Sequence, residues 1–141
     1  HSRLMRDGTL FTKYSKKGLF SSSWKRRYIT LNLYLPMDFP NHLDMFENLQ
    51  PYAELNYYRG KEMHGSVRID KDSVVMRIAD QRNLEFSVRR NISVMSKKRE
   101  TNNNLRYDIA LKTEKGGVES VAKWCKSIRL AIKICTLYDK F

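Results

Sequence analysis

Apolar and polar residues alternate along most of this chain with a period of two, which is typical of strands with one buried face. Seven such runs occur, at residues 8–14, 24–33, 53–59, 65–70, 73–79, 84–90 and 105–113. They are rich in β-branched and aromatic residues, and clusters of turn-forming residues separate them. The pattern therefore predicts seven β-strands.

The period lengthens to about 3.6 residues from Val118 onward, which predicts a helix over residues 118–138. Its apolar face would consist of Val121, Trp124, Cys125, Ile128, Ala131, Ile132 and Cys135. Strands followed by one amphipathic helix predict a mainly β fold. We expect a single domain over residues 1–141, a seven-stranded antiparallel, partly open barrel or sandwich that the C-terminal helix caps.

Residues 34–52 interrupt the alternation between the second and third predicted strands. Prolines bracket this insertion, and it predicts one short helix that Asn41 caps. Its acidic residues, Asp38, Asp44 and Glu47, would suit a docking surface for a protein partner.

The charge balance bears on the partner more than on the fold. The chain has 27 Lys and Arg against 15 Asp and Glu, a net charge of +12 over 141 residues. This excess favours a polyanionic partner, either nucleic acid or an anionic membrane surface. Because the chain begins at His1 rather than Met, we expect it to be part of a longer protein. A targeting or lipid-attachment motif could lie upstream.

Neither the cysteines nor the histidines form a pattern that indicates chemistry. Cys125 and Cys135 lie ten residues apart without ligand spacing, so we interpret them as reduced thiols of a cytosolic protein. The three histidines are scattered, and no nucleophile–base pattern or phosphate-binding glycine loop occurs. We therefore expect no enzyme activity, no cofactor and no metal. No apolar run approaches the ~20 residues of a transmembrane helix.

Four segments, taken in order, resemble the pleckstrin-homology (PH) family over nearly the whole chain. Residues 8–10 (GTL) resemble the G-x-L of its first strand, and residues 24–31 (WKRRYITL) its W-K-x-R second strand. Residues 55–58 (LNYY) resemble the L-x-Y-Y of the third strand. Glu119 and Trp124 resemble the C-terminal helix, whose Trp packs against the barrel. The resemblance implies the PH fold and binding to anionic phospholipid headgroups.

The resemblance also implies a phosphate-gripping pair, Lys25 and Arg27, which match the family's K-x-R. A first-strand Lys that works with this pair in the family is Thr12 here, and the nearest Lys is one residue later, at Lys13. A one-residue slip turns a side chain to the other face unless a bulge intervenes. A less demanding headgroup, such as phosphatidic acid rather than one phosphoinositide, therefore fits better. The insertion and residues 89–99 are also similar in general texture to acylated PH-domain proteins of apicomplexan parasites, which bind phosphatidic acid.

The loop between the first two predicted strands is the strongest candidate for membrane contact. No acidic residue occurs from residue 8 to 37, where six positive charges are present: Lys13, Lys16, Lys17, Lys25, Arg26 and Arg27. Each Lys or Arg near an anionic leaflet contributes about 1 kcal/mol. Lys16 and Lys17 would supply general attraction. Leu19 and Phe20 would insert at the headgroup boundary, or one of them would fold back beneath the hairpin.

A second basic cluster could extend this surface or be an ordinary solvated loop, and the sequence favours neither. It consists of Arg89, Arg90, Lys97, Lys98 and Arg99. Of the adjacent Tyr57 and Tyr58, one is expected in the core, and we expect Tyr58 to present its hydroxyl to a phosphate. Basic residues on the outer face of the helix are interpreted as solvated.

Two alternatives to a membrane-targeting module stay open. The basic composition suits a nucleic-acid-binding domain. No RNA-binding signature occurs, however, and we do not expect a nucleic-acid partner. A protein-interaction scaffold of the same fold could use the insertion or add a peptide strand beside the helix. For the favoured function we expect a cytoplasmic protein, peripheral on the inner face of an anionic membrane, with a second anchor elsewhere.

Overall fold

The structure is a computed structural model that describes residues 2–16, 19–20, 23–38, 50–78, 84–90 and 106–138. Residues 14–16, 19–20 and 38 are described by their backbone alone. The short helix expected at 41–49, with Asp44 and Glu47, lies outside the described residues.

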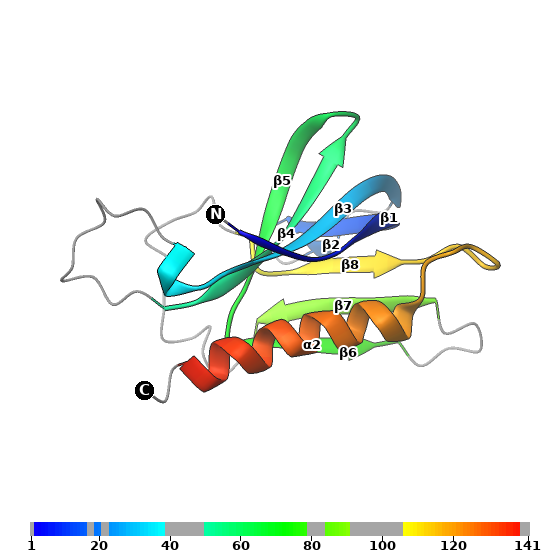
Figure 1. Ribbon diagram of the computed structural model, residues 1–141. Coiled ribbons are helices and arrows are strands. Elements are labelled where there is room, and N and C mark those ends of the chain that lie inside the picture. Colours follow the sequence, from blue (N-terminus) through cyan, green and yellow to red (C-terminus); the bar gives the residue numbers. More distant parts are fainter. Residues whose placement is uncertain are drawn as a thin grey trace.

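Seven antiparallel strands form one open sheet, and a single C-terminal helix packs against it (Figure 1). The long strands of the first half are β1 (Arg3–Lys16), β3 (Lys25–Tyr34), β4 (Tyr52–Arg59) and β5 (Glu62–Ile69). The second half contains β6 (Ser73–Arg77), β7 (Glu85–Arg90), β8 (Ile109–Lys112) and the helix α2 (Val121–Tyr138). The spatial order is β5-β4-β3-β1-β8-β7-β6. The predicted fold class is confirmed, and the arrangement is consistent with a PH-like fold.

Two short elements lie within segments that were predicted as loop or insertion. β2 (Leu19–Phe20) pairs only with the end of β1, through Ser15 and Lys16. A single turn of 3-10 helix, η1 (Pro36–Asp38), follows β3. The β1–β2 pair makes the first hairpin longer than the strand pattern predicts.

β1 begins at Arg3, five residues before the predicted strand. A register irregularity between Leu4 and Arg6 explains the difference, because it breaks the alternation from which the strand was predicted. Pairing with β3 nevertheless continues to Arg3, opposite Leu33. β5 also begins early, at Glu62, because the turn from β4 is tight. Gly60, with φ of 61°, provides the left-handed conformation that such a two-residue turn requires.

The face of the sheet that carries the core side chains is called the inner face, and the opposite face the outer face. Large apolar side chains fill the inner face: Leu10, Ile29, Leu31, Leu55, Val67, Phe86, Val88, Ile109 and Leu111. α2 packs against β6, β4, β1 and β7, and it buries the predicted apolar face, with Ile132 partly buried. Both cysteines are free and buried, and burial raises the pKa of Cys135 to about 12, so this thiol stays protonated.

The contact between Gly8 and Glu119, just before α2, connects three of the residues on which the PH resemblance rests, Gly8, Glu119 and Trp124. The buried Trp124 donates a hydrogen bond from its indole nitrogen to Glu119 at 2.7 Å. A Cβ on Gly8 would lie 2.5 Å from the Glu119 carboxylate. The absence of a side chain at Gly8 therefore allows the carboxylate to reach the indole.

Candidate functional site

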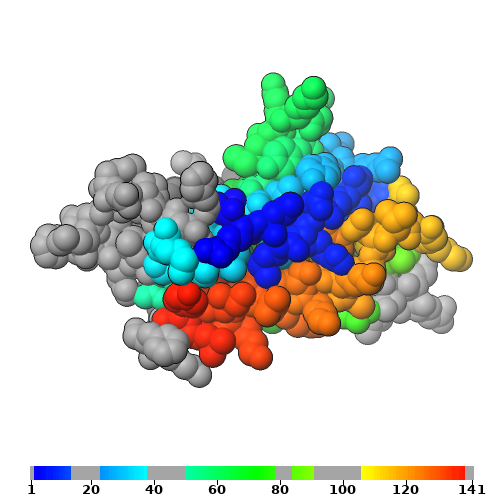
Figure 2. Space-filling model, viewed as in Figure 1, coloured from blue at the N-terminus to red at the C-terminus, as the bar shows by residue number. Residues whose placement is uncertain are grey.

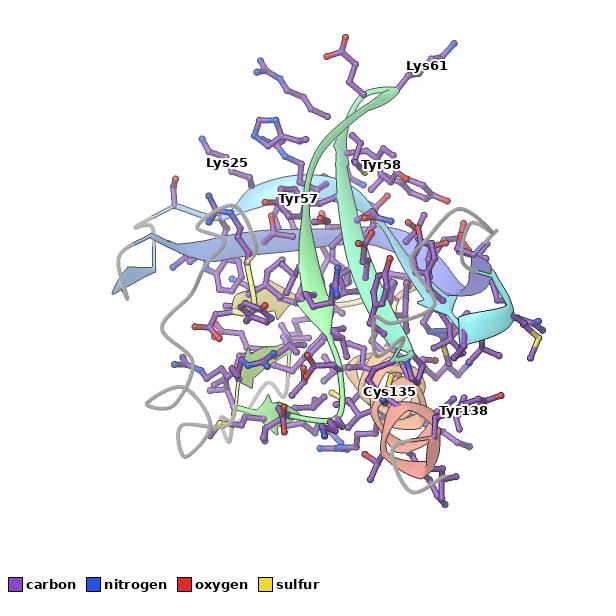
Figure 3. All side chains as sticks on the ribbon, turned by 90° about the vertical axis from the view of Figure 1, so that its left-hand side faces the viewer. Lys25, Tyr57, Tyr58, Lys61, Cys135 and Tyr138 are labelled. Carbon is purple, nitrogen blue, oxygen red and sulfur yellow. The ribbon has the colours of Figure 1, made fainter. Side chains whose placement is uncertain are left out.

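One end of the molecule gathers the tips of two hairpins. The β1–β3 hairpin ends near Lys25, which is opposite Thr12, and the β4–β5 hairpin ends at Gly60 and Lys61. Tyr28 on β3 lies opposite Tyr58 on β4, so both hairpins point to the same end. Figure 3 shows Lys25 and Lys61 at this end, with Cys135 and Tyr138 on the helix far from it. We call this end the hairpin end.

Lys25 and Arg27 lie on the inner face of β3, where the core reaches the hairpin end. Lys25 pairs with Thr12 and Arg27 pairs with Leu10, and both partners on β1 have buried side chains. Paired residues of antiparallel strands share a face, so the two cations point the same way. They are two residues apart on one strand, about 6.5 Å between Cα atoms. This is the pair that the resemblance singled out.

Arg27 has hydrogen-bonding capacity left for a ligand. Its side chain is half-buried, and its Nη1 donates to the carbonyl of Arg26 at 3.2 Å. Its Nε is buried without a partner among the described residues. A guanidinium fixed on a rigid strand with donors to spare is suited to phosphate oxygens. Lys25 is exposed beside it and supplies a mobile point charge.

Thr12 does not take the place of the absent first-strand lysine. Its side chain is fully buried, and its hydroxyl donates to the carbonyl of Lys25 at 3.3 Å. The hydroxyl thus supports the backbone of the β3 residue that carries the charge. The inner face has one cation fewer here than the family pattern would give.

Lys13 lies on the outer face, away from Lys25 and Arg27. The β1–β3 register runs without a break from Gly8 to Thr12, so no bulge turns Lys13 inward. On the other edge of β1, Lys13 pairs with Ala110, between the core positions Ile109 and Leu111 of β8. The Lys13 ammonium instead lies 4.6 Å from the centroid of the Trp24 ring.

The two tyrosines of β4 also divide between the faces. Tyr57 is buried in the core, and Tyr58 is half-buried on the outer face, as the prediction that one would be core requires. The Tyr58 ring lies 5.7 Å from that of Tyr28. Tyr28 in turn donates its hydroxyl to Asp7 at 2.5 Å, and this bond raises the pKa of Tyr28. Tyr58 is therefore not beside Lys25 and Arg27.

Three basic residues at the hairpin end were not predicted as site residues. Arg59 follows the core residue Tyr57 by two positions, so it leaves β4 from the inner face. Lys61 occupies the β4–β5 turn, which projects from the body of the protein in Figure 2. His64 is the extra residue of a register shift in β5, and its ring lies 6.1 Å from that of Tyr57. For Arg59 and Lys61, the sequence signal was a turn-forming glycine between two cations, R-G-K at residues 59–61.

Arg90 is held inside the protein. Only 9% of its side chain is exposed, and its guanidinium forms ion pairs with Asp70 at 2.9 Å and Asp72 at 3.5 Å. The Tyr107 ring lies 4.2 Å from it, and Asp108 accepts its backbone N–H. Arg89, which precedes Arg90 and also belongs to the predicted second patch, is exposed. The charge of Arg90 is thus neutralised within the fold.

The other predicted site residues are described only in part or not at all. Lys16, Leu19 and Phe20 have paired backbones at the tip of the β1–β2 hairpin, with Lys16 opposite Leu19. This places both candidate insertion residues at the hairpin end. The remaining four, Lys17, Lys97, Lys98 and Arg99, lie outside the described residues.

A depression of about 290 Å³ lies between β1 and the segment that precedes α2. Thr9, Phe11 and Arg26 line it together with the carboxylates of Glu114 and Glu119. Two acidic groups beside one cation do not favour a polyanion. The hairpin end is therefore the better candidate site.

The comparisons with known proteins leave the site to be interpreted on its own geometry. Neither protein-family models, nor curated protein sequences, nor solved structures match the chain. Within the described part of the chain, no helix has the length and hydropathy needed to cross a bilayer.

Proposed function

We propose that this chain is a PH domain that binds anionic phospholipid headgroups through its hairpin end. The observation that carries the proposal is the shared inner-face position of Lys25 and Arg27 at the end of a rigid hairpin. Arg59 leaves β4 from the same face, and Lys61 lies at the neighbouring tip. The proposal implies a peripheral protein on the cytoplasmic face of an anionic membrane.

A simple phosphomonoester such as phosphatidic acid fits this surface better than one defined phosphoinositide. Selecting among phosphoinositides requires several donors in fixed positions, and the inner face has Thr12 where the family has a lysine. Lys25 and Arg27 can hold one phosphate, while Arg59 and Lys61 add attraction without choice of headgroup. At about 1 kcal/mol for each cation near the leaflet, four cations supply roughly 4 kcal/mol.

The decisive experiment compares vesicles that differ only in charge. We expect co-sedimentation with vesicles that contain phosphatidic acid or phosphoinositide in phosphatidylcholine, and little with phosphatidylcholine alone. Equal retention on neutral vesicles would contradict the proposal. Tight binding to an RNA or DNA oligonucleotide with none to vesicles would favour the nucleic-acid alternative instead.

A pair of double variants tests the residues. Lys25→Ala with Arg27→Ala should weaken binding to phosphatidic acid vesicles by at least about tenfold, at roughly 1 kcal/mol per charge, without lowering the thermal midpoint by more than a few degrees. Lys126→Ala with Lys133→Ala removes the same charge from exposed positions of α2, and should change binding less than about twofold because screening is strong at that distance. Equal losses would mean that net charge alone drives binding.

A further inference from the structure

α2 carries apolar side chains on the face opposite to the core as well as on the core face. Leu130 and Leu137 are 50% and 47% exposed, and at about 100° per residue they lie roughly opposite the buried Ile128. The half-buried Ile134 lies between them on the same side of the helix. We call Leu130, Ile134 and Leu137 the outer stripe. A helix on the surface of a folded domain normally carries polar residues on this face.

The charged residues of α2 are all basic. The helix contains no Asp or Glu from Val121 to Tyr138, and its four cations lie around the outer stripe: Lys123, Lys126, Arg129 and Lys133. All four are exposed, and among the described residues none of them forms an ion pair with a carboxylate. The outer stripe is therefore an apolar line bordered by positive charge.

The carboxylates that approach α2 from the rest of the fold lie away from the outer stripe. Glu114 and Glu119 lie beside the first turn of the helix, more than one turn before the stripe begins. Asp70 approaches α2 from the core side, near the buried Cys135, and pairs with Arg90. None of these three groups neutralises the cations around the stripe.

The spacing and the charge of the outer stripe favour one kind of occupant, a helix that is acidic. Apolar residues that recur after four and then three positions are spaced as in helices that pack side by side. A second copy of this chain would bring four more cations and no carboxylate of its own α2 to the contact, so like charges disfavour self-association. An acidic helix would instead place carboxylates beside the cations while its apolar residues cover the two leucines.

An anionic leaflet is the other surface that a basic helix face with exposed leucines could meet. Figure 3 shows Lys25 and Lys61 at the hairpin end, far from Cys135 and Tyr138 on the C-terminal part of α2. A leaflet that meets the hairpin end therefore does not reach the outer stripe. The wide apolar face that an interfacial helix would bury in the membrane is packed on the sheet here.

We propose that the outer stripe is a docking site for an acidic amphipathic helix of a partner protein. In Figure 2, α2 (orange to red) lies along the lower side of the molecule, where such a helix can lie against it. The partner can bind while the hairpin end holds another ligand, because the two surfaces are far apart. The inference does not depend on the proposed function, since docking on α2 requires nothing of the hairpin end.

The probe that tests the proposal is a synthetic peptide of three heptads, with Leu at the a and d positions and Glu at e and g. The glutamates repel one another between copies and keep the peptide monomeric. We expect it to bind the full chain in fluorescence anisotropy, with NMR shift changes centred on α2. A peptide of the same composition with scattered leucines, or one with Lys in place of Glu, should bind at least about tenfold more weakly. No binding, or equal binding of all three peptides, would overturn the proposal.

Variants then locate the contact. Leu130→Ser with Leu137→Ser should weaken binding of the acidic peptide by at least about tenfold, because two leucines lose their burial in the complex. Met63→Ser with Met76→Ser is the matched control, since these methionines are similarly exposed on β5 and β6, and it should lose less than about twofold. Both variants should stay folded by circular dichroism because the replaced side chains are exposed.

Three results would overturn the assignment to an acidic helix. Equal losses in the two double variants would mean that the outer stripe is not the contact. Loss of vesicle binding in Leu130→Ser with Leu137→Ser would assign the stripe to a membrane. A wild-type dimer in analytical ultracentrifugation that this variant dissociates would assign it to a second copy of the chain.

Discussion

Single residues decide how the hairpin end is shaped, and Gly65 is the clearest case. It faces Tyr57 across the β4–β5 pair, and a Cβ at this position would overlap the hydroxyl and ring of Tyr57. The ring is rigid, in contrast to the flexible Glu119 carboxylate that approaches Gly8. Tyr57 lies one row deeper in the sheet than Arg27, so Gly65 also fixes the core beside which Arg27 lies.

Gly65→Ala should therefore lower the free energy of unfolding by about 1–3 kcal/mol, the usual cost of forcing extra volume into a packed site. Urea denaturation followed by far-UV circular dichroism measures this loss. Ser66→Ala, at the next and half-buried position, is the control and should change stability by less than about 1 kcal/mol. Equal costs for the two substitutions would show that the Tyr57 contact is not limiting.

At the scale of elements, the corner between β5 and β6 is tied to the end of β7. Asp70 and Asp72 of this corner both pair with Arg90, and the Asp70 backbone carbonyl also accepts from the N–H of Ser73. These ion pairs are largely buried, so removing Arg90 would leave the carboxylates of Asp70 and Asp72 without a compensating positive charge. Strand alternation placed Arg90 here, because it follows the core residue Val88 by two positions on β7.

Arg90→Ala should lower the free energy of unfolding by about 3–5 kcal/mol, the cost of breaking a buried ion pair. Arg89→Ala removes the same charge from the exposed neighbouring position and should cost less than about 1 kcal/mol. Both values come from chemical denaturation. If the folded fraction of Arg90→Ala also lost vesicle binding far beyond Arg89→Ala, Arg90 would have a role at the membrane in addition to its ion pairs.

At the scale of the whole molecule, the described residues include several accessible cations at the hairpin end, and others lie on α2. Lys25 and Lys61 mark this end, and the C-terminal part of α2, with Cys135 and Tyr138, lies away from it (Figure 3). A net charge of +12 attracts any anionic surface from a distance, but only groups within about a Debye length of the leaflet contribute to attachment. Orientation on the membrane should follow from this asymmetry.

Vesicle binding should therefore weaken by at least about tenfold when the salt concentration rises from about 0.1 M to about 0.5 M, because screening shortens the reach of each cation. Titration of the protein with phosphatidic acid vesicles at each salt concentration measures the change. Binding that persists at high salt and disappears in Leu19→Ser with Phe20→Ser would come from apolar insertion at the β1–β2 tip. Affinity that does not respond to salt in the wild-type protein would contradict electrostatic docking.

Strands with clean alternation were the most predictable part of the fold. β3, β4 and β7 begin and end within one residue of their predicted bounds, because each buries one face regularly. The start of β1 was missed because a bulge shifts the phase of its alternation. The start of β5 was missed because the turn at Gly60 and Lys61 is shorter than the loop expected there.

The sequence by itself determined the fold class and the helix face that packs on the sheet, and its spacing put the candidate cations Lys25 and Arg27 on one face of a strand. These features follow from local periodicity and from residue order, which the chain carries without reference to distant contacts. Only the tertiary structure decided which cations lie near one another and on which face of the sheet. Strand register sends Lys13 and Tyr58 to the outer face, brings Lys112 from β8 beside Trp24, and draws Arg90 into ion pairs with a corner some 20 residues away. Such pairings depend on which strands lie side by side, and this long-range choice is made by the packing of the whole sheet.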